Sequence, residues 1–160
     1  MLREAKLRGL SPIHVVFDSW YSGLENLKAI RELGWEWLTR FKSNRQVNPD
    51  PKGNRAISDR EIGPQGRVVH LKGYGLVKVF KRVAQNGDMA YWASSHLEMK
   101  PLERLKWAEL SWTIENDHRG IKPSCGVERA QVRAARAQRN HLGLALRAFL
   151  RQERYSFRTG

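Results

Sequence analysis

Residues 13–41, IHVVFDSWYSGLENLKAIRELGWEWLTRF, decide the fold because two apolar runs enclose one helical pattern. Ile13–Phe17 predicts a buried strand, and residues 35–41 predict a second one. Apolar residues at helical spacing lie between the two runs, namely Leu24, Leu27, Ile30 and Leu33. Gly34 ends this helix. A strand, a helix and a strand in this order predict a parallel pair joined by a right-handed crossover.

Asp18 follows the first predicted strand directly, at the edge of an α/β sheet where ligands usually bind. Its alternative role is a helix cap. Ser22 and Glu25 match an S-x-x-E capping box for the next helix, so the sequence predicts that Asp18 has no capping role. We therefore expect the Asp18 carboxylate to take part in chemistry.

The chain on either side of this unit predicts an α/β protein with a β-rich insertion. Residues 2–9 have helical composition, and residues 42–66 are polar and predict a surface excursion away from the main sheet. Three strands follow, at Val68–Leu71, Leu76–Val83 and Met89–Ser94. We expect a single domain over residues 1–160, with a small antiparallel insertion at residues 42–100. Its aromatic residues are candidates for base stacking, although packing is the expected role: Tyr74, Tyr91 and Trp92.

A helical pattern begins at Pro101 and carries an acid among bases. Its apolar face is expected to pack on the sheet and comprises Trp107, Leu110, Ile114 and Ile121. On the neighbouring face, Glu115, Arg119 and Lys122 lie at i, i+4 and i+7, with His118 beside them. Such an acid can hold a hard metal ion while the bases bind phosphate oxygens, and a solvated face with one ion pair is the alternative. Pro123 predicts that the helix ends near Lys122.

A basic helix is predicted from about Val127 to about Tyr155. Seven arginines fall within an arc of roughly 60° on its helical wheel: Arg129, Arg133, Arg136, Arg147, Arg151, Arg154 and Arg158. A solvated face normally mixes charges of both signs, yet Glu153 is the only acid after Glu128. We interpret this face as one that follows a phosphate backbone.

The composition favours a polyanionic partner. The formal net charge is +13, which points to nucleic acid, although an anionic membrane surface could use the same charge. Cys125 is the single cysteine, so an internal disulfide and a cysteine-based zinc cluster are excluded. No lipidation motif, secretory signal or membrane-spanning run is present, and we expect a cytoplasmic protein with no membrane partner.

Three motifs together resemble the catalytic half of DDE-type insertion-sequence transposases. They are Phe17-Asp18-Ser19-Trp20-Tyr21, then Trp112-x-Ile114-Glu115-x-x-His118-Arg119-x-x-Lys122, and Gln138-Arg139-Asn140-His141. The similarity covers essentially the whole chain. It is greatest to the group with the signature Y-x-x-R-x-x-x-E-x-x-x-x-x-x-K. This chain departs from the signature at two positions, because Ala108 replaces the tyrosine and Ser111 replaces the arginine.

The resemblance implies a partial ribonuclease H-like fold, a mixed sheet flanked by helices, and Mg²⁺- or Mn²⁺-dependent DNA strand cleavage and transfer. Asp18 would be the second catalytic, metal-binding aspartate, Glu115 the catalytic, metal-binding glutamate, and Lys122 a contact to the DNA backbone. The family's first aspartate would lie on a strand before Met1, so the chain resembles the C-terminal portion. The predicted strand Ile13–Phe17 would then form an exposed edge.

We therefore expect a bacterial transposase fragment that associates with the nucleoid and binds transposon ends and target DNA. The isolated chain is expected to bind DNA in a salt-sensitive way and to cleave it poorly, and a homodimer is one compatible assembly for the full-length protein. One alternative is a non-catalytic DNA-binding remnant of a transposase. Another is a complete nuclease of a different family, which needs a third carboxylate, whereas Asp50, Asp59 and Asp88 lie in predicted loops.

Overall fold

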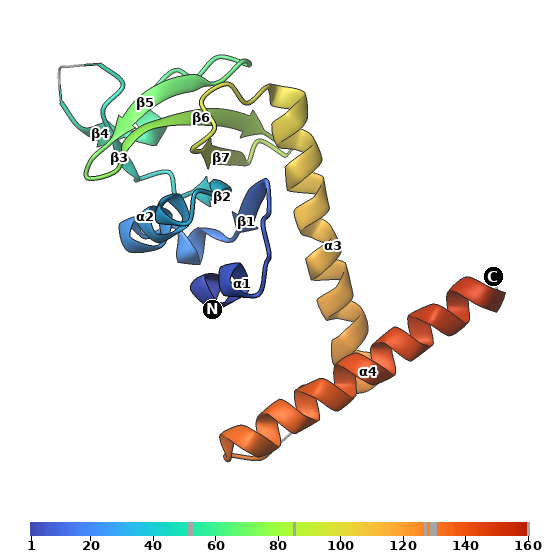
Figure 1. Ribbon diagram of the computed structural model, residues 1–160. Coiled ribbons are helices and arrows are strands. Elements are labelled where there is room, and N and C mark those ends of the chain that lie inside the picture. The colour runs from blue at the N-terminus through green and yellow to red at the C-terminus, as the bar shows by residue number, and fades with distance from the viewer. Residues whose placement is uncertain (51–52, 85, 127, 129–130, 160) are drawn as a thin grey trace. The chain divides into compact units, whose positions relative to one another are not determined.

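The computed structural model describes residues 1–50, 53–84, 86–126, 128 and 131–159, with the backbone alone for residues 114–124. The chain forms two compact units, Met1–Glu109 and Leu110–Gly160, and each is described by itself. The first contains the sheet and the helices that cover it (Figure 1). None of the described helices is long and apolar enough to cross a membrane.

A mixed five-stranded sheet forms the centre of the first unit, with strand order β1-β2-β7-β6-β5. Its strands are β1 (His14–Phe17), β2 (Glu36–Phe41), β5 (Arg67–Leu71), β6 (Gly75–Val83) and β7 (Met89–Ser94). β1 and β2 are parallel, with His14 opposite Glu36 and Phe17 opposite Thr39, and the other neighbouring pairs are antiparallel. The predicted parallel pair is confirmed, and β1 lies at an edge of the sheet.

The remaining helices agree in kind with the sequence pattern, which did not predict a hairpin in residues 42–66 or the two 3-10 helices. The remaining elements are α1 (Leu2–Leu7), the 3-10 helix η1 (Ser19–Tyr21), α2 (Leu24–Glu32), β3 (Gln46–Val47), β4 (Arg55–Ala56), the 3-10 helix η2 (Ile57–Asp59), α3 (Pro101–Cys125) and α4 (Ala135–Thr159). β3 and β4 form a separate antiparallel hairpin. The result is an α/β architecture with a mixed sheet, flanking helices, a small hairpin and a long C-terminal helix.

At β2 both faces of the sheet are buried, and successive side chains of this strand point to opposite sides. Trp37 and Leu38 are adjacent on β2, and they belong to two different apolar clusters. The first cluster includes Leu27 and Ile30 of α2. The second cluster combines residues of the sheet with residues before and within the first turns of α3: Leu38, Phe80, Trp92, Met99 and Ala108, with Trp107 packed against them. Helices thus cover the sheet on both sides.

Residues 42–66 do not leave the main sheet as the sequence predicted. Val47 and Ile57 are fully buried in the first cluster, and Ile62 is 9% exposed. Asn48 and His70 exchange two backbone hydrogen bonds of 2.7 and 2.8 Å, which tie the hairpin to β5. The prediction was based on the many polar residues of this segment. The three apolar side chains of Val47, Ile57 and Ile62 are nevertheless enough to hold it against the core.

The aromatic residues of the β-rich region pack, as predicted. Tyr74, Tyr91 and Trp92 are each at most 9% exposed. The indole Nε1 of Trp37 donates a buried hydrogen bond of 2.8 Å to the hydroxyl oxygen of Tyr74. That bond satisfies two polar groups that burial would otherwise leave unpaired.

Both long helices differ from the predicted boundaries. α3 continues through Pro123 to Cys125, because a proline in the last turn removes only a single backbone hydrogen bond. Gly126 follows with a φ of 59°, the left-handed conformation that commonly ends helices. α4 begins at Ala135 instead of near Val127. Leu110, predicted to pack on the sheet, is 47% exposed, and the side chains of Ile114 and Ile121 lie outside the described residues.

Gly66 is the position where a side chain would disturb the fold most directly. Its φ is 77°, and a Cβ atom there would lie 2.8 Å from both the Phe80 ring and the Val79 carbonyl oxygen. We predict that Gly66→Ala lowers the free energy of unfolding by about 2–4 kcal/mol, from a strained φ and a collision with the sheet. The midpoint of urea denaturation, followed by tryptophan fluorescence, measures this.

Gly87→Ala is the matched control, since Gly87 has a φ of 86° but no atom within 4 Å of the added Cβ. Only the backbone cost of about 1–2 kcal/mol is expected there. Equal destabilisation of the two variants would show that the contact with Phe80 does not restrict residue 66.

Candidate functional site

Asp18 lies at the carboxyl end of β1, and its side chain is exposed. It is the N-cap of η1, where its Oδ1 accepts hydrogen bonds from the Trp20 backbone N–H at 2.9 Å and from the Ser19 hydroxyl at 3.2 Å. The prediction that Asp18 has no capping role is therefore wrong. The 3-10 helix η1 begins directly after β1, and the first backbone N–H groups of η1 need an acceptor, which Asp18 provides.

The capping box expected at Ser22 and Glu25 is absent among the described hydrogen bonds. Gly23 is the N-cap of α2 and makes no side-chain cap bond. The Ser22 hydroxyl instead donates to the Ser19 carbonyl at 2.7 Å. The short helix before α2 uses this serine, because its last carbonyl groups also need partners.

Capping leaves part of the Asp18 carboxylate available. Both capping bonds go to Oδ1, and no described residue donates a hydrogen bond to Oδ2. A carboxylate offers about four acceptor positions on its two oxygens. Asp18 can therefore cap η1 through Oδ1 and bind an external cation through Oδ2.

Two residues beside Asp18 were not assigned a role from the sequence. Trp20 is 84% exposed, and Lys42 Nζ lies 5.4 Å from the centre of its ring, within cation–π range. Together they place an aromatic face and a positive charge at the same edge as the acid. In the sequence, the only indication of this role was a tryptophan two residues after Asp18, within the Phe17–Tyr21 motif.

Buried hydrogen bonds hold this edge of the parallel pair in place. Thr39 is fully buried on β2, and its hydroxyl donates to the Phe17 carbonyl at 2.8 Å. This bond lies one residue before Asp18. It fixes the end of β1 against β2, so the position of the acid is set by the sheet and not by a free loop.

The second predicted acid, Glu115, lies within α3, and its backbone is helical. The side chains of Glu115, His118, Arg119 and Lys122 fall outside the described residues. Asp18 and Glu115 belong to the two separately described units. Their convergence on one cation remains a prediction. Ala108, at the tyrosine position of the signature, is 4% exposed and packs in the second cluster.

The predicted arginine face is preserved in its larger part on α4. Arg136, Arg147, Arg151, Arg154 and Arg158 are all exposed on this helix and fall within an arc of about 60°. Arg133 is exposed but precedes the helix, and Arg129 lies outside the described residues. Glu153 is the single acid of α4. We call the five arginines of α4 that fall within this arc the arginine face.

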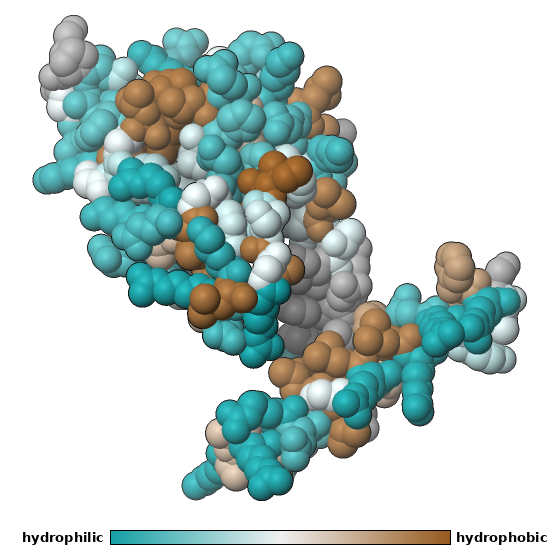
Figure 2. All heavy atoms as spheres, in the orientation of Figure 1, coloured by the Kyte–Doolittle hydropathy of each residue, from teal (hydrophilic) through white to brown (hydrophobic). Residues whose placement is uncertain are grey.

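α4 is amphipathic, and Figure 2 shows hydrophobic side chains beside hydrophilic ones along it. Ala145 is 4% exposed, whereas Leu142 is 48% exposed. The segment before the helix folds back on it through two hydrogen-bonding contacts. Gln138 Nε2 donates to the Val132 carbonyl at 2.9 Å, and His141 Nε2 lies 3.1 Å from the Gly126 carbonyl oxygen.

The other end of the parallel pair, where β1 begins, also carries polar residues. His14, the first residue of β1, is 8% exposed. Burial lowers the pKa of its imidazole, and the negative charges of Glu103 and Glu36 act in the opposite direction, while His96 lowers it further. No pattern in the sequence indicated a function for His14, Glu36, His96 or Glu103.

The sequence model of the family described as transposase DDE domain matches residues 1–151. No curated protein and no solved structure matches the chain.

The capping role of Asp18 can be separated from its charge. We predict that Asp18→Ala lowers the free energy of unfolding by about 1 kcal/mol, because the Trp20 N–H loses its acceptor. Asp18→Asn keeps a side-chain acceptor and should change the free energy of unfolding by only about 0.3 kcal/mol. Urea denaturation of both variants checks this. A loss for Asp18→Asn as large as that for Asp18→Ala would contradict the assigned cap.

Proposed function

Since the chain belongs to the transposase DDE domain family, which catalyses DNA transposition, we propose that it binds DNA phosphates with its arginine face and divalent metal with Asp18 and Glu115. The observation that carries this proposal is the family match over residues 1–151, joined with an exposed carboxylate at the end of a core strand. The proposed reaction class is phosphodiester cleavage and strand transfer.

The Asp18 side chain suits a hard cation. Its Oδ2 receives no hydrogen bond from the described residues, and oxygen ligands of this kind are preferred by Mg²⁺ and Mn²⁺. When bound, such an ion supplies Lewis-acid polarisation of a phosphate oxygen and a nucleophile at neutral pH. The contribution of the chain is to hold Asp18 in place, which the bonds at Oδ1 and the Thr39–Phe17 bond achieve.

The arginine face supports the DNA-binding part of the proposal. Guanidinium groups bind phosphate in a bidentate geometry and keep their charge at all physiological pH values. Five arginines on one exposed strip of α4, with one acid on the whole helix, give a strip of a single sign. Such a strip is stabilised when phosphates replace counterions along it.

We extend the proposal to the residues that the resemblance singles out. His118, Arg119 and Lys122 would contact DNA phosphates beside Glu115, and Arg129 and Arg133 would add to the same surface. Trp20 and Lys42 would contact the DNA next to Asp18, since an exposed ring can stack on a base and a lysine can bind phosphate. The relation to the group with the tyrosine, arginine, glutamate and lysine signature is part of this proposal.

One observation favours a second function, a DNA-binding remnant without chemistry. Asp18 caps η1, so its presence has a structural explanation that requires no metal. The two functions differ in whether the charge of residue 18 matters after its capping bond has been preserved.

We predict that replacing both Arg147 and Arg154 with alanine weakens DNA binding and lowers its salt dependence. Each lost phosphate contact reduces the slope of log K against log salt by about 0.9, so a decrease of about 2 is expected. Arginine-to-alanine changes preserve helix propensity. Fluorescence anisotropy with duplex DNA at several salt concentrations measures the slope.

The control removes two arginines from the N-terminal helix region, Arg3 and Arg8, which pair with Glu32 and Glu4 on an exposed surface. The change in net charge is the same. A slope that falls equally in both double variants would mean that binding follows total charge and not the arginine face.

Asp18→Asn tests the metal assignment, because the capping acceptor remains while the charge is removed. We predict that Mg²⁺ strengthens DNA binding by the wild-type chain and that Asp18→Asn and Glu115→Gln abolish this effect without loss of thermal stability. DNA affinity with and without Mg²⁺, together with nicking of supercoiled DNA, provides the measurement. DNA affinity that is indifferent to Mg²⁺ and to Asp18→Asn would support the remnant instead.

A further inference from the structure

Three residues from distant parts of the first unit lie together at the amino-terminal end of β1. His14 begins β1, His96 follows the end of β7, and Glu103 lies in the first turn of α3. One ligand atom from each residue lies within 4.8 Å of the others. We call these residues the His-His-Glu cluster, and we propose that it is a binding site for a divalent transition metal of the zinc class.

The separations in the cluster suit a cation better than a direct hydrogen bond. His96 Nδ1 and Glu103 Oε1 are 3.7 Å apart, which is too long for a hydrogen bond. Ligand atoms bound to one tetrahedral zinc ion at about 2.0–2.1 Å lie about 3.3 Å from one another. Inward movements of about 1.5 Å or less would therefore complete the site. The side chains of His96 and Glu103 are about one-third exposed and have room to move.

The burial of His14 is an independent observation that points to a ligand. The residue is 8% exposed, and neither of its ring nitrogens has a hydrogen-bond partner among the described residues. His96 Nδ1 is also buried without a hydrogen bond. Unpaired buried nitrogens cost free energy, and a bound cation reduces this cost by accepting the lone pair of one nitrogen of each imidazole.

The packing contacts of His14 do not provide hydrogen-bond partners for its two ring nitrogens. The His14 ring lies against Trp107, with centroids 5.0 Å apart, and near His96, with centroids 5.7 Å apart. These contacts leave the ring edges, which carry both nitrogens, without polar partners.

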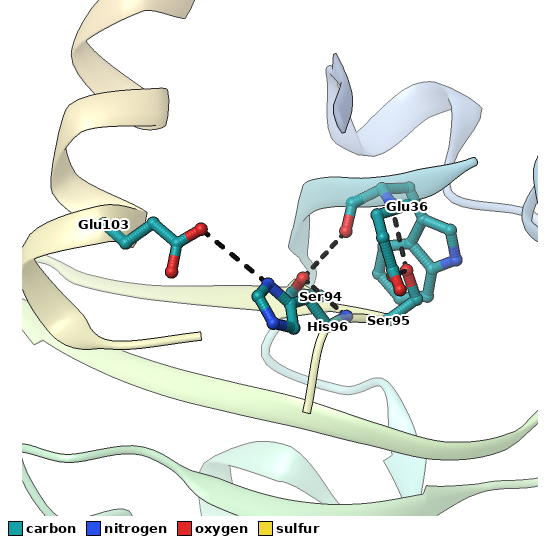
Figure 3. Close-up of polar contacts among 6 residues, drawn as sticks. Glu36, Ser94, Ser95, His96 and Glu103 are labelled. Atoms are coloured by element: carbon teal, nitrogen blue, oxygen red, sulfur yellow. Dashed lines mark hydrogen bonds and ion pairs between the residues drawn. The ribbon is translucent and has the colours of Figure 1, made fainter. Parts of the chain in front are cut away.

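Neighbouring hydrogen bonds fix the position of His96. The Ser94 hydroxyl accepts from the His96 backbone N–H at 3.0 Å and donates to the Trp37 carbonyl at 2.9 Å. Figure 3 shows the Glu103 carboxylate directed at the His96 ring. Ser95 next to it donates to the Glu36 carboxylate and accepts from the Trp37 backbone N–H. The loop that carries His96 is thus attached to β2.

The ligand set selects the class of metal. Two imidazoles and one carboxylate suit Zn²⁺ and related transition ions, whereas Mg²⁺ prefers oxygen ligands. The fourth position would hold water. The site lies at the other end of β1 from Asp18, about 13 Å away for four residues of a strand. Its role would be to connect β1, β7 and the first turn of α3.

The test uses the full 160-residue chain after removal of metal with a chelator. Co²⁺ serves as a spectroscopic probe, and Zn²⁺ affinity is measured by its displacement of Co²⁺ in the presence of excess Mg²⁺. One tight site per chain is expected, with the visible absorption of tetrahedral cobalt and a rise in melting temperature with Zn²⁺. His96→Ala and Glu103→Gln should each weaken Zn²⁺ binding at least about tenfold.

His70→Ala and Glu98→Gln are matched controls, because both residues are exposed and lie outside the cluster. Both controls should retain wild-type Zn²⁺ affinity. The proposal is overturned if the cobalt spectrum is absent, if His96→Ala binds Zn²⁺ as tightly as the wild type, or if Mg²⁺ displaces the ion. Asp18→Asn should leave Zn²⁺ binding unchanged, so this site and the proposed catalytic metal site can fail separately.

Discussion

The parallel pairing of β1 with β2 is the constraint on which the rest of the first unit depends. α2 connects the two strands, and its Leu27 and Ile30 are almost fully buried in the cluster that contains Trp37 of β2. A four-residue strand that is paired on one side has little stability of its own, so the helix must supply the packing. The pairing gives β1 a direction, with His14 at one end and Asp18 at the other.

β2 then determines where the remaining elements are placed. It pairs with β1 on one side and β7 on the other, and its successive residues contribute to different faces of the sheet. Trp37 is bonded through its indole to Tyr74, through its carbonyl to Ser94 and through its N–H to Ser95. Leu38 faces the cluster in which α3 begins. The helix that carries Glu115 therefore starts from a packed position on the sheet.

The first unit buries its apolar side chains in two clusters, while α4 has a single buried residue among those described and carries an exposed strip of arginines. A helix with like charges on one side gains little from its own ion pairs. Its charge pattern is more consistent with a polyanionic partner than with a contribution to folding, in line with a family that acts on DNA.

The sequence predicted those features that depend on neighbouring residues. The apolar runs of β1 and β2, the helical spacing of α2 and the packing of Tyr74 and Tyr91 followed from periodicity and composition. Errors arose where two local signals competed. Asp18 and Ser22 both resembled caps, and the 3-10 helix between them decided which residue capped which helix. The extent of α3 beyond Pro123 likewise depended on the turn at Gly126.

The sequence by itself determined the α/β class, the acid after the first core strand and the arginine face, because each follows from the order or the periodicity of residues along the chain. Only the tertiary structure decided that residues 42–66 are anchored by Val47 and Ile57. It alone brought His14, His96 and Glu103 together. Their proximity results from strand order and from the packing of α3 on the sheet, and neither of these is encoded in the spacing of residues along the chain.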